Sequence, residues 1–310
     1  MGDIGLRVRP QSVVMGISLM TDAALRQTVA GTGATDAEVT ARAVARQRRY
    51  WAIVMFWRLA ILALLLGSWE VTARTGIIDS FFYSYPSAIF ARLWELIRDG
   101  TDEAPLWYHL WITMQESLLG FIFGSIGGIA SGVALGRNKL LADIFSVYIK
   151  TFNAIPRIVL APIFVLLFGF EIWSKVALSL VMVFFVVFAN AFQGVREADR
   201  AMIANARILG ASDWQVTRSV ILPSAMSWIF ASLHISFSFA IVGAIVGEFI
   251  GSRYGIGFII QTARGLHDTA EMYATILIIL VVVLVAEYLM TQIEHRLAKW
   301  RPAPFNEGGN

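Results

Sequence analysis

The sequence contains no cysteine and very little charge. Of its 310 residues only 15% are charged, whereas 57% are hydrophobic, and the mean hydropathy is +0.66. The absence of cysteine excludes disulfide bridges, thiol nucleophiles and metal sites with cysteine ligands. A soluble domain of this length needs far more surface charge, so the composition indicates a membrane protein.

Catalytic and metal-binding patterns are also missing. The four histidines, His109, His234, His267 and His295, show no metal-ligand spacing and no His-Glu-x-x-His motif. No Gly-x-x-x-x-Gly-Lys-Ser/Thr loop occurs, so we expect the chain not to bind ATP by itself. The basic residues are scattered along the edges of apolar segments, which does not suit nucleic acid. We therefore expect no catalytic residues, no metal, no cofactor and no nucleic-acid partner.

What the chain does contain is six apolar runs of about bilayer length. They are Ile53–Trp69, Leu118–Leu135, Ala142–Phe170, Val176–Phe192, Trp228–Ile250 and Tyr273–Met290, and the third is interrupted by Lys150, Pro156, Arg157 and Pro162. We expect an all-α polytopic membrane protein with about six transmembrane helices in lipid. The apolar residues of Ser87–Arg98 share one helical face, which predicts an interfacial helix with Ser87 as its N-cap.

The basic residues predict an orientation. With the N-terminus inside, 16 Lys and Arg residues fall in inner segments and 6 in outer segments. This excess follows the positive-inside rule, so we expect six crossings with both termini in the cytoplasm. The predicted parts are a cytoplasmic tail at 1–50, the first span with an outer interfacial helix at 51–110, a core at 111–295 and a cytoplasmic tail at 296–310.

Glycine recurs at every fourth position in two places. The first ladder is Gly120, Gly124, Gly128, Gly132 and Gly136, and the second is Gly243, Gly247, Gly251 and Gly255. Small residues at this spacing let helix backbones approach closely in lipid. We interpret both ladders as helix-packing surfaces, with a dimer or gating interface as the alternative.

A polar segment at 196–222 separates the fourth and fifth runs. We expect a short helix that ends at Gly210, and then a second helix that is capped by Ser212 or Asp213. Pro223 should break this second helix before the chain re-enters the membrane. Two short amphipathic helices on the cytoplasmic face would form a knob suited to a partner's groove.

This segment resembles the cytoplasmic signature of the permease subunits of bacterial binding-protein-dependent ABC importers, which reads Glu-Ala-Ala, three residues, Gly, nine residues, Ile-x-Leu-Pro. At the expected spacing stand Ala204, Asn205, Ala206, Gly210, Val220, Leu222 and Pro223, so the acidic residue is missing. That substitution is typical of the sulfonate/taurine/nitrate-type branch, many of whose members pair with thiamine-precursor-synthase-like binding proteins. The same branch is indicated by the stretches 153–162, 168–169, 247–251 and 255–257, and the resemblance covers roughly residues 80–300.

The resemblance implies a type I ABC importer permease architecture in the bacterial inner membrane. Two copies of the chain would form the pore, and two cytoplasmic ABC ATPase subunits would bind ATP and Mg. A periplasmic or lipid-anchored binding protein would deliver a small anionic or heteroaromatic nutrient, such as a sulfonate, a nitrate-like anion or a pyrimidine precursor. The ATPase subunits would dock on a coupling loop at 196–223, through Ala204, Asn205, Ala206, Leu209, Gly210, Ala211, Val220, Leu222 and Pro223.

Three ionisable residues inside the apolar runs are candidates for the translocation pathway, because desolvating such groups is costly. Arg157 follows Pro156 at a helix break and could attract an anionic substrate, or pair with a carbonyl or carboxylate for structure. Glu248 could line the outer mouth or cap a re-entrant turn. His234 could face the cavity or serve as a hydrogen-bonded packing residue.

Two other classes of protein remain as alternatives. A membrane-embedded enzyme would need clustered catalytic groups, and the sequence shows none. A secondary transporter or channel that is not coupled to ATP predicts internal inverted repeats, and none is visible. In importers of this kind selectivity lies mainly in the binding protein, so the permease sequence leaves the substrate open.

Overall fold

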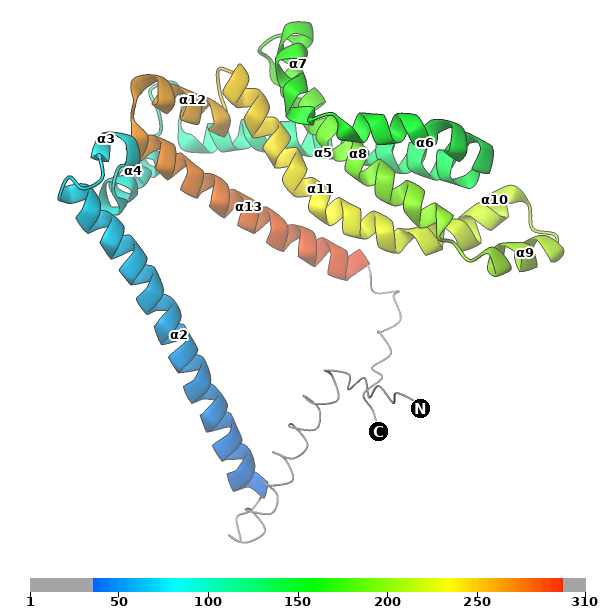
Figure 1. The fold of residues 1–310 in the computed structure, drawn as a ribbon, viewed down its shortest axis with the longest axis horizontal. Coiled ribbons are helices and arrows are strands. Elements are labelled where there is room, and N and C mark those ends of the chain that lie inside the picture. The colour runs from blue at the N-terminus through cyan, green and yellow to red at the C-terminus, as the bar shows by residue number, and fades with distance from the viewer. Residues whose placement is uncertain (1–35, 298–310) are drawn as a thin grey trace, which may run out of the picture. The chain divides into compact units, whose positions relative to one another are not determined.

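The computed structural model describes the backbone of residues 36–297 and, in that range, the side chains of all residues except 36–43, 139, 150, 153, 293–295 and 297. Every regular element in this part of the chain is a helix (Figure 1). The prediction of an all-α chain is therefore confirmed there. The chain divides into two compact units, residues 1–71 and 72–310.

The first unit contains most of the long helix α2 (Asp36–Arg74). Its segment Val44–Arg74 is long and apolar enough to cross a membrane, and none of its most apolar stretch is buried. Exposed apolar side chains such as Trp57 and Leu64 suit a helix surrounded by lipid. The cytoplasmic tail expected at 1–50 stays a prediction. Residues 1–35 lie outside the described part, but from Asp36 the chain is already helical and continuous with the span.

The second unit opens with α3 (Ser80–Tyr83) and α4 (Pro86–Arg98), the predicted interfacial helix. Its N-cap is Tyr85 rather than Ser87, because Pro86 takes the first helical position, where its missing N–H costs nothing. Ile89 and Leu96 are buried, whereas Phe90 and Trp94 on other sides of the helix are exposed.

Arg92 ties α4 to the last helix of the chain. Its Nη2 donates to Glu271 Oε2 at 2.9 Å and its Nη1 to Glu95 Oε2 at 2.9 Å. The hydrogen bond to the Glu271 carboxylate raises the pKa of Arg92 above its usual range. The interfacial helix is thus anchored to the core by charge as well as by its buried apolar face.

The core consists of four long helices that lie side by side, with α8 between α5 and α11, and α13 on the far side of α11 (Figure 1). Their bounds are α5 (Leu106–Arg137), α8 (Ile172–Arg196), α11 (Leu222–Ile250) and α13 (Thr269–Leu297). Together with α2, they make five helices among the described residues that are long and apolar enough to cross a membrane.

The third predicted run is not a single helix. It forms α6 (Lys139–Ala154), the 3₁₀ turn η1 (Arg157–Leu160) and α7 (Ala161–Phe168). Pro156 has no N–H to donate and holds Ile155 in an extended conformation, so α6 must end before it. Instead of six similar spans, the described chain therefore has five long ones and a broken apolar pair.

Two other boundaries differ from the predicted ones. α5 begins at Leu106, well before Leu118, because the polar residues of its first turns are buried against protein rather than exposed. The segment after α11 is not a simple loop, since it forms α12 (Ile256–Leu266). The predicted tail at 296–310 lies outside the described residues from position 298 onward.

The whole first glycine ladder, and Gly243 and Gly247 of the second, pack on α8. A Cβ atom at Gly124 would lie 2.7 Å from Leu180 O, and one at Gly128 would lie 2.9 Å from Phe184 O. From α11, a Cβ atom at Gly243 would lie 2.6 Å from Ser179 Cα of α8. Gly120, Gly132, Gly136, Gly247 and Gly251 make similarly close approaches, all to α8 except Gly251, which meets Phe170 just before it. Glycine thus brings the backbones of α5 and α11 directly against α8.

Candidate functional site

A knob of short helices projects past the ends of α8 and α11 (Figure 1). It is built from α9 (Arg200–Ile208), α10 (Asp213–Val216) and the π-helical segment η2 (Thr217–Ile221). The predicted stop at Gly210 is confirmed, since this residue has φ +85°, in the left-handed region that favours glycine. Ser212 is the N-cap of α10 and forms a capping box with Gln215, which decides between the two predicted caps.

The prediction that Pro223 breaks the second helix is wrong. The chain is continuously helical from Asp213 to Ile250, and Pro223 lies inside this segment. The wider π turn accommodates it, because the N–H of Leu222 already reaches back to Thr217 O. In a regular α-helix, a proline ring clashes with the carbonyl group four residues earlier and leaves that carbonyl without an N–H partner. The π turn shifts the carbonyl groups, so the clash is relieved.

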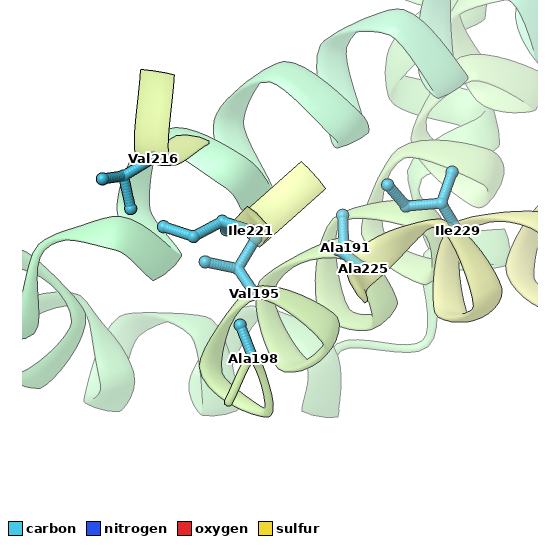
Figure 2. Packing of buried hydrophobic residues seen from close by; sticks show 7 residues of the cluster. All are labelled: Ala191, Val195, Ala198, Val216, Ile221, Ala225 and Ile229. Carbon is cyan, nitrogen blue, oxygen red and sulfur yellow. The ribbon is translucent and has the colours of Figure 1, made fainter. Parts of the chain in front are cut away.

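The base of the knob is a compact apolar cluster. Figure 2 shows its side chains gathered where α8, η2 and α11 meet. The members are Ala191, Val195, Ala198, Val216, Ile221, Ala225 and Ile229, all at most 9% exposed. Because one cluster contains residues of both long helices and of the knob, the knob is packed as one unit with α8 and α11.

The top of the knob is apolar and exposed. Ile208 is 82% exposed, Leu209 87% and Trp214 66%. Arg207 Nη2 lies 3.1 Å from Asp213 Oδ1 and closes the turn between α9 and α10. These large apolar side chains are exposed on a polar segment that lies between two apolar helices. An exposed apolar patch of this kind is typical of a protein interface.

The predicted coupling residues divide between these two parts. Ala206, Ala211 and Leu222 are half-buried against the apolar cluster. Val220 is also half-buried, whereas Ala204, Asn205, Leu209, Gly210 and Pro223 are exposed. The sequence signature therefore combines residues that build the knob with residues that it presents. Trp214, which the signature does not include, belongs to the presented set.

Arg157 begins η1, at the break between α6 and α7. Its guanidinium carbon lies 5.2 Å from the ring centroid of Phe185 on α8, a cation–π arrangement, and the residue is half-buried. The break thus places a guanidinium group beside the central helix α8.

His234 contributes to the interface between α11 and α13. Its Nε2 lies 2.8 Å from Glu287 Oε2, and Ser238 Oγ donates to Glu287 Oε1 at 2.5 Å. The sequence reasoning did not single out Glu287, although an acidic residue within the last apolar run was a visible signal. His234 and Glu287 thus join α11 to α13 through their ionisable side chains.

Glu248 lies near the C-terminal end of α11 and caps the next helix. Its Oε2 accepts from the N–H of Gly257 at 2.7 Å, in the first turn of α12, and its Oε1 accepts from Thr113 Oγ1 on α5 at 2.6 Å. A carboxylate at a helix N-terminus satisfies free N–H groups and suits the helix dipole.

Several buried polar residues around Glu248 were missed by sequence reasoning. His109, Thr113 and Glu116 on α5 and Lys175 on α8 are all at most 2% exposed. Lys175 stands just before the predicted run Val176–Phe192, but it lies within α8 with its Nζ donating to the carbonyls of Phe170 and Glu171. Single polar residues in apolar runs give no sequence signal that they meet in space.

Comparison with known proteins fits this geometry. Residues 120–299 match the family model described as binding-protein-dependent transport system inner membrane component. The chain is 30% identical, over 86% of its length and 94% of the relative, to the putative aliphatic sulfonates transport permease SsuC of Bacillus subtilis. It is 29% identical to the riboflavin transport system permease RibX of Chloroflexus aurantiacus, over 77% of this chain and 88% of the relative.

A solved structure shares the fold. A chain of the MetNI methionine ABC transporter, in an inward-facing conformation, superposes with a TM-score of 0.54 at 20% identity, covering 67% of this chain and 97% of that one. The family match covers more than half of the sequence and includes the knob. Its members work with separate ATPase and binding-protein partners, and ATP is bound by the ATPase. The chain is therefore an inner-membrane permease subunit of the binding-protein-dependent ABC importer family, not an enzyme.

Proposed function

We propose that the knob at 196–223 is the coupling element on which the ATPase subunits dock, and that two copies of the chain form the pore. The observation that carries this proposal is the exposed apolar top, Ile208, Leu209 and Trp214, on a base shared by α8 and α11. The stroke of the ATPase would enter the membrane through these two helices. Both termini and the knob then lie in the cytoplasm, in agreement with the excess of basic residues in these segments.

The parts of the chain then have distinct tasks. The N-terminal tail at 1–50 lies in the cytoplasm, the region 51–110 provides the first span and an outer interfacial helix, the core at 111–295 carries the pathway, and 296–310 is a second cytoplasmic tail. The exposed aromatic residues of α4, Phe90 and Trp94, support its placement at a membrane surface.

The docking proposal is tested by placing a charge on the knob's top. Leu209→Asp would desolvate a carboxylate in the interface, so we expect at least a tenfold loss of ATPase subunit copurified with the full-length permease. Leu266→Asp is the matched control, because Leu266 is 73% exposed at the opposite end of the core. We expect this control to retain the ATPase.

Wild-type recovery and coupled ATPase activity for Leu209→Asp would reject the knob as the docking site. The wild-type complex also tests the pore composition, because native mass spectrometry should find two copies of this chain and two ATPase subunits. A single copy paired with a different permease would contradict the homodimer.

For the cargo, we propose a small anionic nutrient, with sulfonates as the first candidates and heteroaromatic compounds as the second. The names of SsuC and RibX support these two classes. Arg157 favours the anion, because its guanidinium lies at the helix break beside α8, where a planar charged donor can hold a sulfonate or carboxylate. In this proposal Arg157 is a pathway residue.

Uptake of radiolabelled taurine, an alkanesulfonate and riboflavin by cells with the complete transporter tests the cargo class. For an anionic cargo, Arg157→Ala should raise the KM about tenfold or more, since a charged hydrogen bond contributes about 1.5–3 kcal/mol. Arg157→Lys keeps the charge but not the planar fork, so it should fall in between. An unchanged KM in Arg157→Ala would remove this residue from the pathway, and uptake of riboflavin alone would favour the heteroaromatic class.

A further inference from the structure

The first helix carries a run of arginine residues just before its apolar stretch. Arg46, Arg48 and Arg49 lie on α2, and their side chains are exposed. Between positions 39 and 69 the sequence contains five arginines and no aspartate or glutamate. This part of the helix therefore has no carboxylate of its own to balance its positive charge.

Two of these arginines share one face of α2. Arg46 and Arg49 are three positions apart, a spacing at which side chains are neighbours on a helix surface. The ion pairs formed within the described part of the chain join other side chains and include neither of these two. Like charges at this spacing destabilise a helix. An external anion that lies against this face would therefore stabilise it.

Two aromatic residues stand between the arginines and the most apolar part of the helix. Tyr50 is 64% exposed and Trp51 52%, and their rings lie edge to face with centroids 6.4 Å apart. Exposed Tyr and Trp residues at the end of an apolar span are typical of the level of the lipid headgroups. Arg46 and Arg49 precede Trp51 by at most about 8 Å along the helix axis. The two guanidinium groups can therefore reach the lipid phosphates.

We propose that Arg46, Arg48 and Arg49 form a binding surface for the headgroups of anionic glycerophospholipids. A guanidinium group presents a planar pair of donors that matches a phosphate group. A zwitterionic headgroup also contains a phosphate, but its own ammonium group cancels the charge, so the arginines select headgroups with a net negative charge. The surface belongs to α2 alone, so it depends neither on the coupling element nor on the cargo.

A short-range fluorescence measurement at Ile53 tests which lipid lies against this face. Ile53 is 48% exposed and follows Arg49 by four positions, so it lies on the same face one turn nearer the hydrocarbon. Because the chain has no cysteine, Ile53→Cys can be labelled with bimane before the ATPase subunit is added. The labelled full-length permease and its ATPase partner are placed in phosphatidylcholine nanodiscs. These contain a small fraction of phosphatidylglycerol or phosphatidylcholine that carries a nitroxide quencher on its acyl chain.

The nitroxide should quench more strongly on phosphatidylglycerol than on phosphatidylcholine at the same mole fraction. Each basic residue near an anionic surface favours binding by about fivefold, so we expect phosphatidylglycerol to be enriched at least about threefold near the label. Raising the salt from about 0.1 M to about 1 M shortens the Debye length from about 10 Å to about 3 Å, so most of the enrichment should be lost. Equal quenching by the two lipids at low salt would overturn the proposal.

A pair of substitutions removes the charge without shortening the side chains much. Arg46→Gln combined with Arg49→Gln keeps the helix propensity high and should abolish most of the enrichment. The matched control is Arg253→Gln combined with Arg264→Gln, which removes the same charge at exposed positions in the turn before α12 and in α12. This control should keep the enrichment. Enrichment that survives the first pair, or that both pairs reduce equally, would contradict a specific role of the α2 arginines.

An acidic protein surface, such as one on the ATPase subunit, is the competing occupant. Quenching of the labelled permease is therefore compared with and without the ATPase. Equal enrichment of phosphatidylglycerol in both samples supports the lipid. Enrichment that disappears when the ATPase is bound would show that a protein covers the arginines in the assembled transporter, and would overturn the proposal.

Discussion

The close packing of α5 against α8 depends on single missing methyl groups. At Gly124 the space for a Cβ atom is filled by the carbonyl of Leu180 and the side chain of Val183, at 2.7 and 2.8 Å. Backbone atoms cannot turn aside as a flexible side chain can, so the site does not tolerate even alanine without a shift of α5 or α8. The neighbouring Gly127 differs, because its nearest contact is the ring of Phe184 at 3.4 Å.

This difference predicts unequal effects of the same substitution. Gly124→Ala should destabilise the permease by about 1–3 kcal/mol, the usual cost of overpacking. Gly127→Ala should be neutral or slightly stabilising, because alanine also has the higher helix propensity. Thermal unfolding of both variants in the same detergent measures the difference. Equal melting temperatures would show that α5 and α8 are not held at this close distance.

The glycine ladders and the buried polar residues show which features the sequence could predict and which it could not. The four-residue spacing of Gly120–Gly136 pointed to a packing surface, but it could not name α8 as the surface that fills it. Lys175 and Glu116 were missed because each only lowers the hydropathy of its own run. Their burial depends on packing between distant segments, which no local pattern contains.

At the scale of helices, proline has two opposite effects in this chain. Pro156 ends α6, whereas Pro223 continues a helix through the π turn at Thr217–Ile221. The sequence correctly indicated the first break, because Pro156 and Pro162 stand close together in one run. It gave the wrong result for Pro223, because a π turn arises from packing of the knob's base and has no reliable residue signature.

The turn between α9 and α10 gives a prediction at this scale. Gly210 has φ +85° and open space around it, so the conformation alone opposes a side chain. Gly210→Ala should weaken this turn by about 1 kcal/mol, and Gly210→Asn by less, because asparagine adopts the left-handed region more readily. Hydrogen exchange of the α9 amides measures the effect.

The comparison of the two Gly210 variants separates conformation from size. Faster exchange in Gly210→Ala than in Gly210→Asn supports a conformational requirement for glycine. If the larger asparagine is the more damaging of the two, the requirement is for space, which would contradict the open surroundings of this residue.

At the scale of the whole molecule, the lack of cysteine makes the proposed orientation directly measurable. Any introduced thiol is the only one in the chain. Met202→Cys on the exposed face of α9 should react with an impermeant maleimide only after the inner membrane is opened. Gly265→Cys near the end of α12 should react from the periplasmic side in intact inner membranes. The reverse pattern would invert the proposed topology.

The unbroken helix from Asp213 to Ile250 has a mechanical consequence. Its 38 residues extend about 57 Å. They connect Trp214, at the exposed top of the knob, to Glu248, whose carboxylate caps α12. Tilted by a few degrees about one end, a helix of this length displaces its other end by several ångströms, whereas a pivot at Gly243 leaves only about 10 Å of helix beyond it, so that end moves by less than about 1 Å. In the coupling proposed above, work done by nucleotide binding on one side of the bilayer would reach the other side through this one helix, without passing through a loop.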